Sequence, residues 1–193
     1  MRYNLSEINA VIKDRRTIYP ETYSDRKVHK EQIELLLNNA LWAPTHGMTQ
    51  PWRFKVYMGD SKQKLAMQLL SCYNNYAGEK AVEAKQKRTV LRVEKSSAVI
   101  AICMQKDPNN KIPEIEEVEA TACAVQNMYL TATAYGLGCF WSTPKFIYEG
   151  MMDDFLKLEE DQVCLGFFYV GYPGEEWPKG QRKPLEYVTE WKE

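Results

Sequence analysis

The feature that most constrains the fold is one long helical segment, residues 114–135, whose apolar and small residues spread around most of its circumference. Val118, Ala122 and Val125 recur at spacings of four and then three, which is the period of an α-helix. Alanine and threonine residues fill most of the other sides. A helix that is apolar on most sides needs partners on most sides, so we expect this segment to be a central, widely buried helix.

The shorter patterns around this helix predict an α+β protein, with helices packed on a small sheet. Apolar stripes at helical spacing predict helices within residues 5–12, 33–41, 65–73 and 151–156. Apolar and aromatic runs predict strands at residues 52–57, 98–103, 140–142 and 163–171. Residues 74–95 are charge-rich and weakly periodic, and we expect a mobile helical excursion there.

The charge balance argues against several classes of partner. The chain has 193 residues, with 25 Lys+Arg against 26 Asp+Glu and a net charge of −1. We therefore expect no general binding to nucleic acids or to membrane surfaces. No apolar run approaches the roughly 18 residues that a membrane-spanning helix needs. The length suits one domain, residues 1–193.

The cysteines are scattered through the chain, mostly within apolar runs, and no two of them form a Cys-x-x-Cys pair. In such runs a reduced cysteine acts as a small core residue. We therefore expect a reducing, cytoplasmic environment and no metal site. The five cysteines are Cys72, Cys103, Cys123, Cys139 and Cys164.

Three polar segments could carry binding groups. Between the second helix and the first strand, Pro44 and Pro51 restrict the path of a Gly-containing loop, and such loops commonly position functional residues. Arg15-Arg16 closes the first helix, and Arg182-Lys183 lies in the tail. Taken one at a time, each segment has an ordinary explanation. The loop can be a simple connection between a helix and a strand, Arg15-Arg16 can be a basic helix C-terminus, and Arg182-Lys183 can belong to a solvated tail.

Taken together and in order, these segments resemble the nitroreductase family of flavoproteins, over almost the whole chain. No single motif is specific, and the resemblance rests on their common register. The matching segments are Arg15-Arg16-Thr17, Ala43-Pro44-Thr45, Gln50-Pro51-Trp52, Gly136-Leu137-Gly138, Phe140-Trp141-Ser142-Thr143, the strand ending at Gly171, and Arg182-Lys183-Pro184. With a histidine two residues after Pro44, the chain most resembles the branch of the family that has an Ala-Pro-x-His loop before Gln-Pro-Trp.

The resemblance implies a nitroreductase-like α+β fold, with a small, mainly antiparallel sheet flanked by helices, in an intertwined homodimer. It implies FMN as the cofactor, bound at the dimer interface. Residues 174–193 would be a tail that packs at this interface. The aromatic content of the tail agrees, because the segment from Trp177 to Trp191 has no evident partner within one subunit.

The resemblance also assigns cofactor-binding residues along the flavin. Arg15, Arg16 and Thr17 would contact the phosphate and ribityl end, and Arg182 and Lys183 would converge on the same phosphate. An arginine suits this role because its planar fork donates two parallel hydrogen bonds.

The other assigned positions lie along the ring and the ribityl chain. Trp42 and His46 would touch the flavin, and Gln50 would lie beside the ribityl or pyrimidine region. Trp141, Ser142 and Thr143 would pack near the ring and its dimethylbenzene edge. One departure is Met48, because many members have at this position an asparagine that hydrogen-bonds the pyrimidine edge, and methionine cannot donate.

The implied activity is transfer of hydride from NADH or NADPH, through N5 of FMN, to a nitroaromatic, quinone or related acceptor by a ping-pong mechanism. The flavin carries this chemistry, so we nominate no catalytic acid or base. A separate Rossmann site is not expected, since the chain lacks a Gly-x-Gly-x-x-Gly motif. Two alternatives remain open: flavin cleavage or dehalogenation on the same fold, and a non-catalytic flavin-binding protein.

Overall fold

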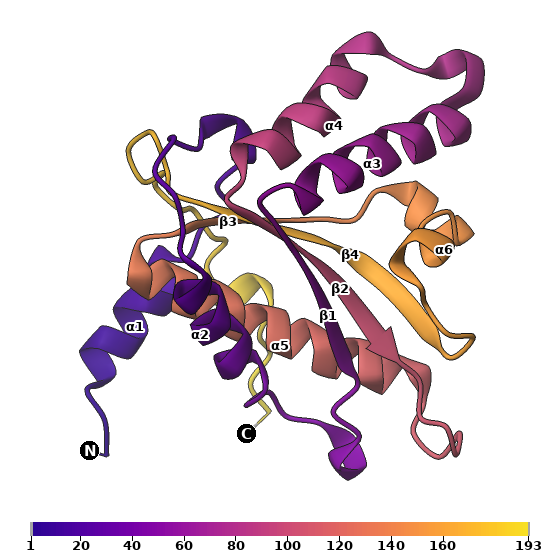
Figure 1. The fold of residues 1–193 in the computed structure, drawn as a ribbon. Coiled ribbons are helices and arrows are strands. Elements are labelled where there is room, and N and C mark those ends of the chain that lie inside the picture. Colours follow the sequence, from indigo (N-terminus) through magenta and orange to yellow (C-terminus); the bar gives the residue numbers. More distant parts are fainter. Residues whose placement is uncertain (1, 193) are drawn as a thin grey trace.

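The structure, a computed structural model, describes residues 2–192 and contains one antiparallel sheet with helices on both faces (Figure 1). In this part of the chain the strand order is β1-β2-β4-β3, and each pair of neighbours is antiparallel. The strands are β1 (Trp52–Met58), β2 (Ala98–Gln105), β3 (Gly138–Ser142) and β4 (Gln162–Gly171). The predicted α+β class with a small antiparallel sheet is confirmed.

The helices form a layer on each face of the sheet (Figure 1). One layer contains α1 (Leu5–Asp14), α2 (Lys30–Ala40) and α5 (Glu114–Tyr135). The opposite layer contains α3 (Ser61–Ala77), α4 (Glu83–Lys95) and the short α6 (Asp153–Leu156). No helix within residues 2–192 is long and apolar enough to cross a lipid bilayer.

The central strand β2 separates two hydrophobic cores, and its alternate residues contribute to each. Ile100 and Ile102 face the core under α5, whereas Val99 and Ala101 face the core under α3. All four residues are fully buried, as expected for a strand covered on both faces. The α5 helix is buried along most of its length, which confirms its predicted central position.

Residues 74–95 form the end of α3, a short 3-10 turn and α4, so the helical part of that expectation is confirmed. The two helices pack together, and Gln86 of α4 donates a hydrogen bond to the side chain of Asn74 at 2.8 Å. Of the described side chains of α4, only Val93 is buried. The weak periodicity follows from this, because one buried residue leaves almost no apolar stripe in the sequence.

The tail after Gly174 begins by packing on its own chain. The indole Nε1 of Trp177 donates to the carbonyl of Asp14 at 2.7 Å, and its ring packs against the core under α3. The expectation that the aromatic tail has no partner within one subunit is therefore wrong for Trp177. Farther along, Tyr187 and Trp191 are exposed.

Candidate functional site

The basic segment that ends α1 is held against α5 and the tail. Arg15 is the C-cap of α1, and its guanidinium lies over the ring of Tyr129, 5.3 Å from the ring centroid. The Arg16 guanidinium donates from Nε to the carbonyl of Pro178 at 3.1 Å and from Nη1 to the carbonyl of Lys13 at 2.6 Å. The Arg15 guanidinium can therefore donate hydrogen bonds to a ligand. Part of the Arg16 guanidinium already binds the tail through the carbonyl of Pro178.

Tyr129 of α5 joins three of the predicted cofactor residues. Its hydroxyl accepts a hydrogen bond from the backbone N–H of Trp141 at 2.8 Å, and the side chain of Thr17 lies beside the same hydroxyl. Burial raises the pKa of Tyr129 to about 12, while these hydrogen bonds and the Arg15 charge act in the opposite direction. Arg15, Thr17 and Trp141 therefore meet at one neutral phenol, which the sequence indicated only as a helix residue.

The segment Trp141 to Thr143 leaves β3 in a position fixed by β4. The indole Nε1 of Trp141 donates to the carbonyl of Leu165 at 3.2 Å. Gly166 has a φ of +127°, and a Cβ there would overlap the carbonyl of Ser142 and crowd the Trp141 indole. Only glycine lets β4 approach this closely. The approach holds Trp141 and Thr143 on the wall of a cavity of about 460 Å³.

Three cations from α4 border a second, smaller cavity beside Ser142. Lys85, Arg88 and Arg92 line this cavity of about 130 Å³ together with Ser142. The guanidinium of Arg92 is oriented by Glu21, with Nε and Oε1 2.8 Å apart. No sequence motif indicated this group. The available signal was its spacing of three and four residues, which places all three on one face of a helix.

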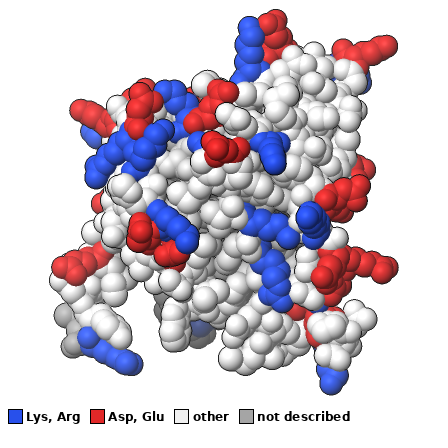
Figure 2. All heavy atoms as spheres, in the orientation of Figure 1, with Lys and Arg blue, Asp and Glu red and all other residues white. Residues whose placement is uncertain are grey.

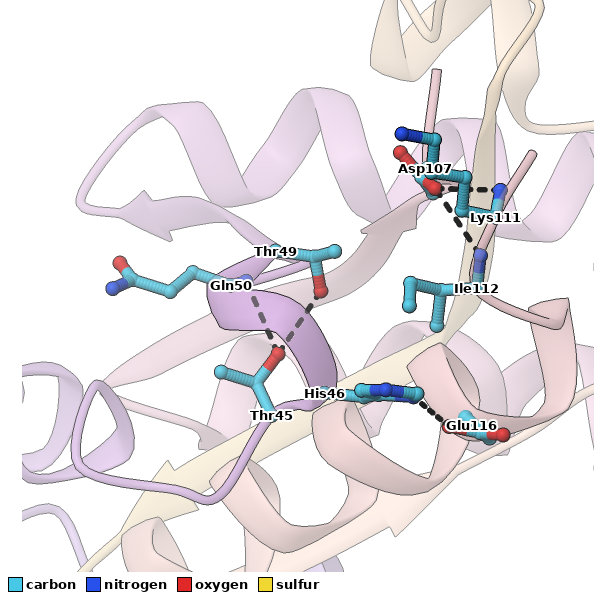
Figure 3. Close-up of polar contacts among 8 residues, drawn as sticks. All are labelled: Thr45, His46, Thr49, Gln50, Asp107, Lys111, Ile112 and Glu116. Carbon is cyan, nitrogen blue, oxygen red and sulfur yellow. Dashed lines mark hydrogen bonds and ion pairs between the residues drawn. The ribbon is translucent and has the colours of Figure 1, made fainter. Parts of the chain in front are cut away.

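The loop between α2 and β1 has a backbone that its own threonines organise (Figure 3). The Thr45 hydroxyl accepts the backbone N–H of Gln50 at 3.2 Å and lies 3.0 Å from the Thr49 hydroxyl. The side chain of Gln50 points away from the other labelled residues. Trp42, at the start of the loop, is 86% exposed. Two predicted cofactor residues are therefore presented to the outside of the subunit.

His46 connects this loop to the N-terminal turn of α5. Its Nδ1 lies 2.6 Å from Oε2 of Glu116, as Figure 3 shows. The neighbouring loop is closed by Asp107, whose carboxylate accepts the backbone N–H groups of Asn109, Lys111 and Ile112. These donors hold the pKa of Asp107 below its usual range.

Within one subunit, the predicted cofactor residues fall into two separate groups along α5. Arg15, Thr17 and Trp141 meet at Tyr129, whereas the loop carrying Trp42, His46 and Gln50 is joined to Glu116. Because an α-helix rises 1.5 Å per residue, these two anchor points lie about 20 Å apart along α5. The structure does not bring the two groups together in a single chain.

The second basic segment passes close to the first. A Cβ at Gly180 would overlap the guanidinium of Arg16, so the tail runs directly over this side chain. Arg182 follows two residues later and is exposed, and the Lys183 ammonium lies 5.8 Å from the ring centroid of Tyr187. The tail backbone thus crosses the Arg16 side chain, while Arg182 and Lys183 are exposed.

Elsewhere on the surface, charges of both signs are interspersed. On the face drawn in Figure 2, Lys and Arg side chains lie among Asp and Glu side chains, with uncharged surface between them. A mixed surface of this kind does not attract polyanions in general. The face drawn in Figure 2 therefore has no broad basic area.

Comparison with known proteins agrees with this architecture. Residues 12–172 match the Nitroreductase family. A crystal structure of a nitroreductase-like family protein from Bacillus cereus is 30% identical, with a TM-score of 0.81 and coverage of 100% of this chain and 99% of that chain.

Two further proteins are similar over nearly their whole length. The FMN-dependent nitroreductase NfnB from Mycobacterium smegmatis, solved in complex with NADPH, is 19% identical, with a TM-score of 0.75 and coverage of 97% of this chain and 99% of that chain. A Bacillus subtilis protein, provisionally named NAD(P)H nitroreductase YfhC, is 22% identical over 180 residues, which are 93% of this chain and 91% of that protein. With the match over residues 12–172, these likenesses show that the chain belongs to the nitroreductase family.

Proposed function

We propose that this protein is an FMN-dependent oxidoreductase that uses NADH or NADPH to reduce a nitroaromatic, quinone or related acceptor. The main observation behind this proposal is that Arg15, Thr17 and Trp141 all lie at Tyr129. Segments far apart in sequence thus bring a side chain assigned to the phosphate close to one assigned to the flavin ring. The family membership and the names of the relatives support it.

The residues at this end of the molecule fit a phosphate. Arg15 has a guanidinium over Tyr129, Thr17 offers a hydroxyl, and Arg182 follows the point where the tail crosses Arg16. A phosphate dianion is best held by several such charged donors. We assign Arg15, Arg16, Thr17, Arg182 and Lys183 to the phosphate and ribityl end of FMN.

The residues beside Ser142 fit the polar edge of a flavin ring. Lys85, Arg88 and Arg92 bring positive charge to a cavity that Ser142 also lines, and its sequence neighbours Trp141 and Thr143 line the cavity of about 460 Å³. Positive charge near the pyrimidine edge stabilises the electron-rich reduced ring. At Met48, which cannot donate a hydrogen bond, backbone groups or Thr49 would take the role that the asparagine has in other members.

When bound, FMN would supply the redox chemistry, with hydride entering and leaving at N5 in two half-reactions. The protein's part is to bind the phosphate, pack the ring against Trp141 and present one ring face to NAD(P)H and then to the acceptor. Tyr129 keeps its proton at neutral pH, because its pKa is raised to about 12, and it acts as a positioning group.

The division of the cofactor residues along α5 supports a homodimer. In this arrangement the loop with Trp42, His46 and Gln50 from a second copy completes the site that Arg15 and Trp141 begin. A free surface for the second copy exists on α1, where, among the described residues, no side chain is buried and Leu5, Ile8 and Ile12 form an exposed apolar stripe. Such a stripe on a helix normally marks an interface.

We further propose one domain over residues 1–193, with the tail 174–193 reaching the dimer interface beyond Gly180. The exposed Tyr187, Val188 and Trp191 would be covered there. The Ala-Pro-x-His loop defines the branch of the family, and the His46–Glu116 contact would fix this loop for the second copy.

The decisive experiment is anaerobic stopped-flow reduction of the purified protein by NADH and by NADPH. The protein should be yellow, should release FMN rather than FAD on heating, should be bleached by NADH or NADPH within the time of catalytic turnover, and should regain its colour when a quinone or nitroaromatic is added. A colourless protein whose spectrum does not change on titration with FMN would refute the proposal. A flavin that is bound but not reduced would indicate a non-catalytic flavin-binding protein.

A further inference from the structure

Two cysteines, Cys103 and Cys164, are direct partners across neighbouring antiparallel strands. The register of β2 and β4 pairs Cys103 with Cys164 and Ile102 with Gly166, so Leu165 is the extra residue of a β-bulge between the two pairs. Both cysteines belong to the core on the α3 face of the sheet. Directly opposed residues on one face of a sheet are in contact, so the two thiols are neighbours.

This pairing has the dimensions of a disulfide. Opposed residues in antiparallel strands have Cα atoms about 4.5–5.5 Å apart, and disulfides join Cα atoms about 4.4–6.8 Å apart. Both cysteines are in the thiol form in the structure. The strands can therefore accept a bond between the two sulfur atoms with little movement of the backbone.

Only one of the two thiols borders a cavity. Cys103 is fully buried, whereas Cys164 is 5% exposed and lines the cavity of about 460 Å³ that Trp141 and Asp153 also line. A small neutral oxidant that enters this cavity meets Cys164 first. Cys139, by contrast, is buried on β3 opposite Val170 and has no thiol in register.

The environment also makes the two sulfurs unequal. The side chain of Cys103 lowers the pKa of Cys164, although burial acts in the opposite direction. The same interaction, together with burial, raises the pKa of Cys103. Asp153, the acidic group that faces both sulfurs, disfavours the thiolate at each of them, and Lys55 favours it at Cys103. The interaction thus favours ionisation of Cys164, to the reactive thiolate form, over ionisation of Cys103.

We propose that Cys164 and Cys103 form a reversible oxidation site, in which a hydroperoxide entering the Trp141 cavity converts the two thiols to a cross-strand disulfide. The Cys164 thiolate attacks one peroxide oxygen, an S–O bond forms, the O–O bond breaks and hydroxide leaves, which gives a sulfenic acid. The Cys103 sulfur then attacks Cys164, the S–S bond forms and the S–O bond breaks. The oxygen leaves as water with the thiol proton, so that two thiols and one hydrogen peroxide give one disulfide and two waters.

A thiol modification is the chemistry that this pair fits. Among residues 2–192, no group of three His, Cys, Asp or Glu side chains is arranged to hold a metal ion. The disulfide would join β2 to β4 beneath the bulge and draw the Cys164 sulfur away from the cavity wall. The cavity is shared with Trp141, which is assigned to the flavin ring, but the thiol reaction itself needs no flavin, so its test does not depend on the proposed redox function.

The test is oxidation of the folded, full-length protein with hydrogen peroxide. A Cys123→Ser background removes an exposed thiol that would form disulfides between molecules. After oxidation, free thiols are alkylated under denaturing conditions and peptides are mapped without reduction. The expected product is one linked peptide pair containing Cys103 and Cys164, which disappears after treatment with dithiothreitol.

Single variants separate the roles of the two sulfurs. Cys103→Ser should leave Cys164 as a sulfenic acid that dimedone traps, and Cys164→Ser should leave Cys103 reduced. Cys139→Ala removes a buried cysteine that has no other cysteine opposite it in the sheet. This variant should form the Cys103–Cys164 disulfide at the rate of the parent. The proposal is overturned if Cys103 and Cys164 both stay reduced in the folded protein, or if they are linked only after unfolding in urea.

If Cys103→Ser does not fold, a second experiment tests the proposal on protein in which both cysteines are intact. Phenylarsine oxide binds two adjacent thiols and should protect the folded protein from forming the linked peptides. If the arsenical protects neither cysteine from later alkylation, the two thiols are not a reactive pair and the proposal fails.

Discussion

The hydroxyl of Tyr129 accepts the backbone N–H of Trp141 at 2.8 Å, and this bond connects the C-terminal half of α5 to β3. It determines where the segment Trp141 to Thr143 lies relative to Arg15, whose guanidinium lies over the ring of the same tyrosine. The bond therefore links the two ends of the proposed cofactor site inside one subunit.

Replacing Tyr129 by phenylalanine should lower stability and loosen this segment. The change leaves the partly buried N–H of Trp141 without its acceptor, which typically costs about 1–3 kcal/mol. Urea unfolding should show this loss, whereas Tyr135→Phe, a change at an exposed tyrosine on the same helix, should stay within about 0.5 kcal/mol of the parent. Equal stability of the two variants would show that the Tyr129 bond has no structural role.

The same variant should change the alkaline limb of the stability profile. Tyr129 has a pKa near 10 in the unfolded chain and about 12 in the folded protein. Its contribution is complete below pH 10 and is lost as pH rises to 12, because the unfolded state ionises first. The loss is on the order of 2–3 kcal/mol. Between pH 10 and 12 the stability of Tyr129→Phe should fall less steeply than that of the parent.

Arg15→Ala and Arg182→Ala should each weaken FMN binding without unfolding the protein. A charge-assisted hydrogen bond contributes roughly 1.5–3 kcal/mol, which is about tenfold to a hundredfold in affinity. If both arginines bind one phosphate, the loss of FMN binding free energy in the double variant should differ from the sum of the two single losses by about 0.5 kcal/mol or more. Flavin fluorescence titrations measure these affinities.

Riboflavin, which has no phosphate, is the matched ligand for these two variants. Its affinity should change much less than that of FMN. Equal losses for FMN and riboflavin would show that the arginines do not bind the phosphate. If only Arg182→Ala has no effect, the assignment of the tail fails while that of Arg15 to Thr17 stands.

Arg88→Ala should weaken FMN and riboflavin alike, because Arg88 is assigned to the ring and not to the phosphate. Removal of positive charge near the ring should also make the two-electron reduction potential more negative, by about 30 mV for a loss of 1.4 kcal/mol. Lys87→Ala removes an equal charge from the same helix, where Lys87 pairs with Glu83 on the exposed side, and should leave both quantities unchanged. An identical shift of the reduction potential in both variants would show that the effect comes from the overall charge of the protein and not from Arg88 at the ring.

Ile8→Asp should convert the proposed dimer to a monomer. Ile8 is 43% exposed within one subunit, so the substitution has little effect on that subunit's own core. A charge buried in an apolar interface without a partner is strongly unfavourable. Light scattering at several micromolar concentrations gives the mass, and Glu7→Gln on the same helix is the control. A parent protein that is already monomeric would refute the dimer.

The sequence was sufficient for the parts of the fold that bury apolar residues in a regular pattern. Residues 114–135 are apolar on most sides and the run from Ala98 to Cys103 is apolar throughout, so each is expected at the centre of the fold. By contrast, α4 buries Val93 and little else, so its cations Lys85, Arg88 and Arg92 look like an ordinary solvated face. Their function as cavity lining depends on a tertiary contact with Ser142 that no local pattern encodes.

The candidate site was predictable as a set of residues and not as an arrangement. Motif order indicated Arg15 and His46 equally well, but only the structure shows that they are anchored at Tyr129 and at Glu116. Trp177 was misjudged for a related reason. Its partner is a backbone carbonyl, that of Asp14, and backbone groups leave no trace in a sequence motif.

The separation of the two residue groups along α5 has a genetic consequence. If each site takes Arg15 from one copy and the His46 loop from the other, two inactive proteins with different lesions can restore each other. A mixed dimer of an Arg15→Ala chain and a chain altered in the His46 loop contains one site with both defects and one site with none. Coexpression of two such alleles would then yield activity that neither produces alone.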